Sequence, residues 1–233
     1  MRLDKFLSNA KVLSRKECEI AVKKRNITIN NKVATKKDVM VEPNVDIVKL
    51  NGETIEYNEF IYLMINKPQG YVSSTDDPRD KTVLDLLPEK YKKYNLFPCG
   101  RLDKDTVGLV ILTNNGKASH SLLSPKHHVE KVYEFKLAQP VKTEDIEHLE
   151  KGITLLDGYE TKPCKINMLN QTHGHITLIE GKYHQIKRMF GAVNNKIIFL
   201  KRISFSTIKL DPTLEEGQFR ELTESEKQVF ETA

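Results

Sequence analysis

The stretch Gly100-Arg101-Leu102-Asp103-Lys104-Asp105-Thr106-Val107-Gly108 runs directly into the apolar segment Leu109-Val110-Ile111-Leu112. Two glycines bracket a polar loop, and the apolar segment predicts a buried strand behind it. A loop fixed to the end of a buried strand is a rigid support for a carboxylate such as Asp103, as nucleophilic or acid–base catalysis requires. An ordinary charged turn is the alternative. A metal site at Asp103 and Asp105 is disfavoured, because the sequence supplies no further carboxylates nearby.

A second segment, Glu180–Phe190, predicts a helix that spans Tyr183–Val193. Its buried face is predicted from apolar residues spaced i, i+3, i+4 and i+7, namely Ile186, Met189, Phe190 and Val193. Its polar face carries His184, Lys187 and Arg188. Two cations near a helix N-terminus oppose the helix dipole. The mismatch indicates a bound anion, either a phosphate or a carboxylate from elsewhere in the fold; a solvated basic face is the alternative.

The remaining periodicities predict a mixed, mainly antiparallel α+β domain. Strands are expected at 61–65, 108–113, 132–137, 164–169, 175–179 and 197–205. Helices are expected at 83–87, 117–123, 144–151, 183–193 and 224–230, with Thr143 and Thr223 as N-caps of two of them. Tyr133 and Phe135 share one face of a strand. The neighbouring His127 and His128 lack the partners of a metal site.

The first fifty residues form a separate basic module. They hold 12 Lys+Arg and 6 Asp+Glu, a net charge of +6, whereas the rest of the chain holds 37 − 12 = 25 basic and 32 − 6 = 26 acidic residues. Two short helices are expected, the second with Ser14 and Glu17 as a capping box, followed by strands at 27–29 and 45–50. A basic unit joined to a near-neutral one suggests that the first binds a polyanion.

The bulk composition fits one or two globular domains, since 39% of the 233 residues are hydrophobic. No apolar run approaches the roughly 18 residues of a membrane span, and no apolar leader follows Met1. Cys18, Cys99 and Cys164 are far apart and odd in number, so free thiols in a reducing cytoplasm are expected.

Several of these segments together resemble the Rsu-type ribosomal RNA pseudouridine synthases. The resemblance rests on the order of four stretches, Asn66–Tyr71, Gly100–Asn114, Lys131–Tyr133 and Glu180–Met189. The basic module resembles an S4 RNA-binding domain. We therefore expect an S4-like α/β module at residues 1–57 and a catalytic domain with a mixed, mainly antiparallel sheet at residues 58–233.

The resemblance implies roles for individual residues. Asp103 would be the essential carboxylate, Tyr133 would stack on the uracil, and Lys187 would pair with Asp103. The substrate would also be contacted by Arg101, Leu109, Arg188 and His184, with Leu109 as part of the apolar floor under the base. In the S4-like module the RNA backbone would be contacted by Arg2, Lys5, Arg15, Lys16, Lys23, Lys24 and Arg25. No cofactor or metal would be needed.

The Tyr183-His184 form of the helix segment resembles the small-subunit enzyme, whose target is a single uridine near position 516 of 16S rRNA. We expect a cytoplasmic monomer that acts on 16S rRNA, either naked or in a 30S assembly particle. A large-subunit (23S) rRNA pseudouridine synthase is the nearest alternative. A non-catalytic RNA-binding assembly factor and a metal-dependent nuclease are alternatives of other classes.

Overall fold

The computed structural model describes residues 1–124 and 127–231, in two compact units, Met1–Ile61 and Tyr62–Ala233. The boundary predicted after residue 57 lies four residues before the division between these units. Within the described residues, no helix is long and apolar enough to cross a membrane.

The first unit packs two helices, α1 (Leu3–Asn9) and α2 (Arg15–Lys23), over a small sheet. The sheet has the order β2-β1-β3-β4, formed by β1 (Ile27–Ile29), β2 (Lys32–Val33), β3 (Val48–Leu50) and β4 (Glu53–Thr54). The predicted capping box is confirmed: Ser14 Oγ accepts from Glu17 N at 3.2 Å, and Glu17 Oε2 accepts from Ser14 N at 2.7 Å. Phe6 stacks on Tyr57 within the core, with ring centroids 4.8 Å apart.

One predicted strand of this unit is too long. The structure has Val48–Leu50 where 45–50 was expected, because the preceding residues form a turn. The Asp46 carboxylate accepts from Asn30 Nδ2 at 2.7 Å and from the Glu42 amide at 2.8 Å. These hydrogen bonds form a local turn in place of the backbone hydrogen bonds of a strand, and they leave Val45 exposed.

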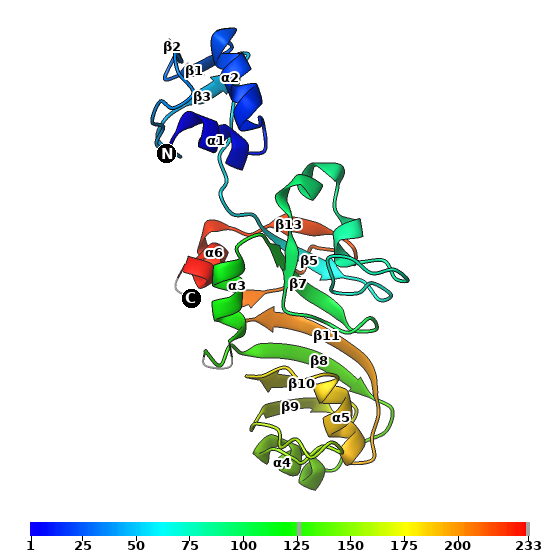
Figure 1. Cartoon of the computed structure of the whole chain (residues 1–233). Helices are drawn as coiled ribbons and strands as arrows, with labels where there is room; N and C mark the ends of the chain where they lie inside the picture. Colours follow the sequence, from blue (N-terminus) through cyan, green and yellow to red (C-terminus); the bar gives the residue numbers. More distant parts are fainter. Residues whose placement is uncertain (125–126, 232–233) are drawn as a thin grey trace. The chain divides into compact units, whose positions relative to one another are not determined.

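The second unit is built on a nine-stranded sheet with the order β13-β5-β7-β11-β8-β10-β9, with β6 added to β7 and β12 added to β11 (Figure 1). Its strands are β5 (Tyr62–Lys67), β6 (Phe97–Cys99), β7 (Val107–Thr113), β8 (Lys131–Leu137), β9 (Lys165–Asn170), β10 (His173–Leu178), β11 (Ile197–Phe205), β12 (Ile208–Lys209) and β13 (Phe219–Glu221). Among the described strand pairs, β7 with β11 is parallel and the others are antiparallel, so the predicted mixed, mainly antiparallel sheet is confirmed. The short strands β6, β12 and β13 were not predicted.

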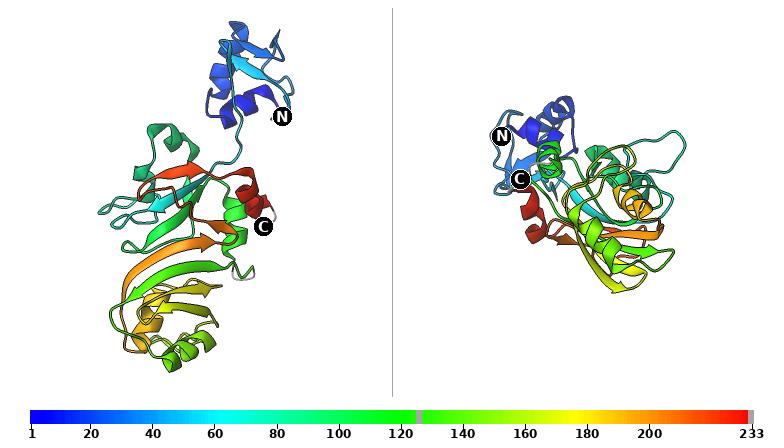
Figure 2. Two further views of the ribbon diagram at one scale, coloured as in Figure 1. Left: turned by 180° about the vertical axis from the view of Figure 1, so that it is seen from behind. Right: turned by 90° about the horizontal axis from the view of Figure 1, so that it is seen from below.

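Helices pack against this sheet in two groups (Figures 1 and 2). One group is α3 (Gly116–Leu123) and α6 (Glu224–Glu231), which contact each other and cover a core cluster that contains Leu109 and Phe205. The other includes α4 (Thr143–Lys151) beside β9 and α5 (Gln185–Ala192) beside β11. Phe190 of α5 packs on Phe135 of β8, with ring centroids 4.8 Å apart. Two 3-10 helices, η1 (Val83–Leu86) and η2 (Glu89–Tyr94), precede β6.

The predicted helix boundaries need two corrections. Thr143 is the first residue of α4 instead of its N-cap, which is Lys142 and makes no side-chain cap hydrogen bond. Helix α5 begins at Gln185 instead of Tyr183, because His184 has left-handed backbone angles (φ 49°, ψ 32°). The predicted N-cap at Thr223 is confirmed, since its Oγ1 accepts from Glu226 N at 3.3 Å.

All three cysteines are free and buried, as expected. Burial raises the pKa of each thiol, and that of Cys164 reaches about 12.

The parallel contact between β7 and β11 is short and very close. It pairs Lys201 with Val107 and Arg202 with Gly108. Beyond it, the buried Arg202 side chain donates from Nε to the Leu109 carbonyl at 2.7 Å. Gly108 has φ +98°, and a Cβ at this position would overlap the backbone O and N of Arg202. Both the backbone angle and the space therefore require glycine.

We predict that Gly108→Ala lowers the free energy of unfolding by about 3 kcal/mol or more, because it adds strain at positive φ to a backbone clash. Gly116→Ala is the matched control: Gly116 begins α3 at an ordinary φ with open space around its Cβ position. That change should leave stability unchanged or raise it by about 0.5 kcal/mol. Urea unfolding followed by circular dichroism measures both, and equal stability of the two variants would contradict the prediction.

Candidate active site

The loop that carries Asp103 is fixed by hydrogen bonds at its base. Thr106 N donates to the Asp103 carbonyl at 3.1 Å, which closes a turn directly before β7. Gly70 N donates to the Lys104 carbonyl at 2.8 Å, and Ser73 Oγ accepts from Leu102 N at 3.1 Å. The turn after β5 and the loop before β7 are therefore held as one unit, which limits the positions open to the Asp103 carboxylate.

Lys67 supports this loop from within the protein. Its side chain is fully buried at the end of β5. Its Nζ donates to the carbonyls of Thr106 at 2.7 Å, Pro68 at 3.1 Å and Lys104 at 3.3 Å. Burial lowers the pKa of Lys67 to about 8, and the charges of Asp105 and Asp103 oppose that shift. Sequence reasoning missed Lys67 as a site residue, since nothing in Asn66–Gly70 indicated that the amine points inward.

The Asp103 carboxylate lies against two basic groups of the α5 segment. Lys187 Nζ is 3.1 Å from Asp103 Oδ2, and His184 Nε2 is 3.5 Å from Asp103 Oδ1. Lys187 also contacts Asp105 Oδ1 at 2.5 Å. Arg188 in turn contacts Asp157 at 2.5 Å. Lys187 and Arg188, the two cations that are unfavourable near a helix N-terminus, are therefore each paired with a carboxylate.

The ion pair between Lys187 and Asp105 shifts the pKa values of both groups. Burial alone would lower the pKa of Lys187, but its hydrogen bonds and charge pairing with Asp105 and Asp103 outweigh burial and raise it. Burial alone would raise the pKa of Asp105, but Lys187 outweighs that effect and lowers it. Lys187 is therefore held as an ammonium ion between two carboxylates at neutral pH.

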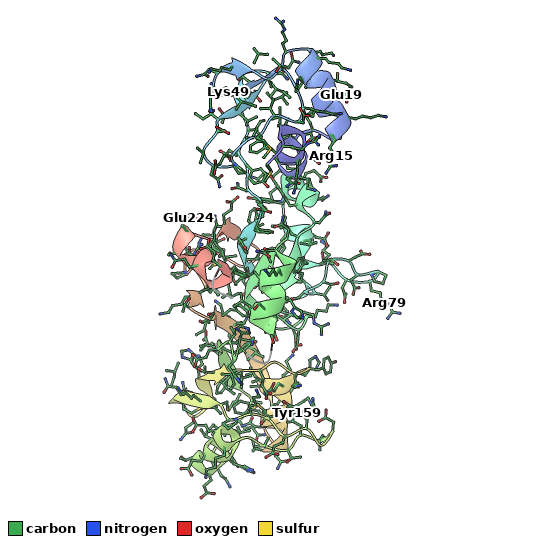
Figure 3. The ribbon with its side chains drawn as sticks, turned by 60° about the vertical axis from the view of Figure 1, so that its left-hand side comes forward. Arg15, Glu19, Lys49, Arg79, Tyr159 and Glu224 are labelled. Atoms are coloured by element: carbon green, nitrogen blue, oxygen red, sulfur yellow. The ribbon has the colours of Figure 1, made fainter. Side chains whose placement is uncertain are left out.

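A partly buried polar cluster fixes the chain directly before α5. Gln185 is 4% exposed; its Nε2 donates to Glu180 Oε1 at 2.7 Å, and its Oε1 accepts from Lys182 N at 2.9 Å. Tyr159, labelled in Figure 3, donates from its hydroxyl to Glu180 Oε2 at 2.6 Å, which raises the pKa of Tyr159 to about 12. This cluster holds the turn from which His184 and Lys187 project. Sequence reasoning missed both partners: Glu180 lies in the Glu180–Met189 stretch but was assigned no role, and no motif included Tyr159.

A cavity opens over Asp103. Its polar lining includes Arg101, Asp103, Thr106, His184 and Lys187, and the ring of Tyr133 forms part of its wall. Its apolar lining is Leu102, Leu178, Ile186 and Leu200. The Thr106 hydroxyl is buried and has no hydrogen-bond partner in the described structure. Apolar walls, one aromatic ring and a carboxylate suit a flat, polar ring such as a nucleobase with its sugar.

Five of the predicted site residues converge on this cavity: Arg101, Asp103, Tyr133, His184 and Lys187. Two do not. Leu109 is fully buried in the cluster beneath α3 and α6, so it is not the floor of the cavity. The guanidinium of Arg188 pairs with Asp157 and donates to the Tyr183 carbonyl at 3.3 Å, and Arg188 does not line the cavity.

The basic residues predicted for RNA contact in the first unit are all exposed. Arg2 pairs with Asp4 at 2.8 Å, and Lys23 pairs with Glu19 at 3.1 Å. Figure 3 labels Arg15 and Glu19 on α2. No carboxylate of the described chain forms an ion pair with Lys5, Arg15, Lys16, Lys24 or Arg25. Within the described ranges, no group of three or more His, Cys, Asp or Glu side chains is arranged to hold a metal ion.

Comparison with known proteins identifies two family models in the chain. The model described as RNA pseudouridylate synthase matches residues 61–192, and the S4 domain model matches residues 1–47. A Bacillus subtilis protein named uncharacterized RNA pseudouridine synthase YtzG is 47% identical over 97% of this chain and 96% of its own length. The Escherichia coli ribosomal small subunit pseudouridine synthase A is 38% identical, over 97% of this chain and 98% of its own. A crystal structure of a pseudouridylate synthase superposes with a TM-score of 0.70 at 38% identity, covering 99% of both chains.

We predict a specific alkaline behaviour from Lys67. Its pKa in the folded state, about 8, lies below its ordinary value of 10.5. At pH values between these two, the unfolded chain binds the proton that the folded protein has lost, so the contribution of Lys67 to stability rises with pH. Below pH 8 both states are protonated, and the full cost of the buried charge is present.

Unfolding free energies of the wild type and Lys67→Met, measured from pH 7 to 10.5, test this. The stability of the wild type minus that of the variant should increase by about 3 kcal/mol across the window. Lys131, whose pKa burial also lowers to about 8, is present in both proteins and cancels in the difference. A pH-independent difference would show that Lys67 does not titrate in this way.

Proposed function

The chain belongs to the RNA pseudouridylate synthase family, and on that premise we propose that it converts a uridine of 16S ribosomal RNA into pseudouridine, with Asp103 as the essential carboxylate. The observation that carries the proposal is the meeting of Asp103, Lys187 and Tyr133 in one cavity. These residues come from the loop before β7, from α5 and from β8. A protein that only binds RNA has no need for this combination.

The reaction is an isomerisation, so its atoms balance within the nucleotide. The bond between C1′ and N1 breaks, uracil turns, and a new bond joins C1′ to C5. The C5 proton leaves and N1 gains a proton. The Asp103 carboxylate can either add covalently or remove a sugar proton on a glycal route, and the proposal holds for both. The reaction involves no net oxidation. Besides the exchange of one carbon–nitrogen bond for one carbon–carbon bond it needs only proton transfers, which the side chains in the cavity can carry out.

The other groups of the cavity have supporting roles in this proposal. Lys187 neutralises and orients Asp103 at 3.1 Å. Tyr133 offers its ring to the uracil, while Leu102 and Leu200 supply the apolar wall that Leu109 was expected to form. A uridine in a helix must leave its stack to reach Asp103, which costs a few kcal/mol. Arg101, which is exposed and lines the cavity, is placed to hold the displaced strand.

The first unit supplies affinity in this proposal. Its unpaired basic side chains, Lys5, Arg15, Lys16, Lys24 and Arg25, are free to contact RNA phosphates. Such contacts orient the substrate without reading its sequence. The small-subunit target is supported by the similarity to the Escherichia coli ribosomal small subunit pseudouridine synthase A and by the Tyr183-His184 pair. The 30S particle as substrate, the monomeric state and a cytoplasmic location stay predictions.

We predict that Asp103→Asn lowers kcat on the order of 10⁴-fold or more, because an amide can neither attack nor accept a proton as the carboxylate does. Asp105→Asn is the matched control: it makes the same chemical change two residues away and also removes a contact to Lys187. As Asp105 is exposed, this change should alter kcat by about threefold at most. Tritium release from RNA labelled at uridine C5 measures both rates, and turnover by Asp103→Asn would refute the assignment.

We also predict that deleting the gene removes one pseudouridine from 16S rRNA and leaves those of 23S rRNA intact. Mass-spectrometric mapping of both RNAs, with and without the gene, gives the result directly. Restoring the gene should restore the site, and restoring the Asp103→Asn form should not. Loss of a 23S site with 16S unchanged would favour the large-subunit alternative, and unchanged maps would contradict the proposed function.

A further inference from the structure

Tyr183 presents a bare aromatic face to solvent beside the cavity. Its side chain is 77% exposed. Its inner face stacks on the imidazole of His184, with ring centroids 3.8 Å apart and planes inclined by 17°. The described residues provide no other ring contact for Tyr183 and no hydrogen bond to its hydroxyl.

The stack is connected to the proposed catalytic carboxylate through His184. His184 Nε2 lies 3.5 Å from Asp103 Oδ1, and the imidazole ring stacks on the ring of Tyr183. His184 has a left-handed backbone, a conformation that residues with a Cβ seldom adopt. Strained backbone of this kind is concentrated at functional sites.

The surroundings hold Tyr183 in place. Lys182, one residue earlier, lines the cavity, and its amide donates to the buried Gln185 at 2.9 Å. Arg188 Nη1 donates to the Tyr183 carbonyl at 3.3 Å. The backbone on both sides of the ring is therefore fixed, so the ring is presented at low entropic cost to a binding partner.

Resting on the proposed function, we infer that the exposed face of Tyr183 is a stacking platform for the base of a nucleotide next to the target uridine. The target itself occupies the cavity with Tyr133, which is too far inside to share its ring with a second base. A neighbour loses a stacking partner when the target leaves the strand. An exposed ring at the cavity mouth replaces that partner, and it accepts any base because every base has an aromatic face.

Steady-state kinetics on an in vitro 16S transcript tests the platform. Tyr183→Ala should raise KM about five- to a hundredfold and leave kcat close to the wild-type value. Tyr183→Phe keeps the ring and should restore KM. Leu169→Ala removes another exposed apolar side chain, on the edge strand β9, and should leave both constants unchanged. All variants should keep the wild-type melting temperature.

A photo-crosslink gives the position of the contact. A Tyr183→p-benzoylphenylalanine protein should crosslink to a nucleotide adjacent to the modified uridine. An unchanged KM for Tyr183→Ala would overturn the inference. So would a fall in kcat at constant KM, because Tyr183 would then act through His184 on Asp103.

Failure of the proposed function is distinguishable from failure of the platform. If the wild type forms no pseudouridine in 16S or 23S rRNA, whether naked or in assembly particles, the proposed function fails. Filter binding of the same 16S transcript then judges the platform alone: a five- to hundredfold weaker Kd for Tyr183→Ala would support it, and an unchanged Kd would overturn it.

Discussion

The ammonium group of Lys187 joins two parts of the chain that are 82 residues apart, and the candidate site depends on that junction. Lys187 lies between Asp103 and Asp105. Without Lys187, the carboxylates of Asp103 and Asp105 in one short loop would repel each other. Without these carboxylates, the ammonium group of Lys187 would be an unpaired cation in the first turn of α5. The ion pairs remove both unfavourable arrangements. The pairing explains why the polar loop before β7 and the basic first turn of α5 lie next to each other at the cavity.

The rigidity of the loop has a different source from its charge. Lys67 donates hydrogen bonds to three loop carbonyls from within the protein. The polar cluster of Glu180, Gln185 and Tyr159 fixes the chain before α5 on the other side of the site. Each support is a hydrogen-bond network with a buried side chain, Lys67 or Gln185, at its centre, so the site residues are preorganised by the fold. Gly108 adds a third constraint, because it lets β11 approach β7 closely at the point where the loop ends.

Much of this arrangement could be predicted because it follows from local rules. The spacing of residues indicates the capping box at Ser14 and the long strands. The charge pattern indicates the two cations near the N-terminus of α5. The charge pattern left a phosphate and a carboxylate open as the anion beside Lys187, and the family resemblance named Asp103. Family resemblance then supplied the order of the segments, which local rules do not give.

The misses have physical causes. Strands β12 and β13 have two and three residues, too few for a period of two to stand out. Leu109 was expected at the floor of the cavity from the family resemblance alone, whereas it packs with Ile111 in the core cluster beneath the helices. The start of α5 was missed because the left-handed conformation of His184 leaves no mark in an amphipathic pattern.

The buried cysteines have a practical consequence. Alkylating reagents attack the thiolate, and burial suppresses that form at Cys18, Cys99 and Cys164 while also blocking access. A cysteine introduced on the surface would therefore react alone, with the native three left in place. Spectroscopic probes can be attached at chosen positions of either unit, so the distance between the two units can be measured in solution.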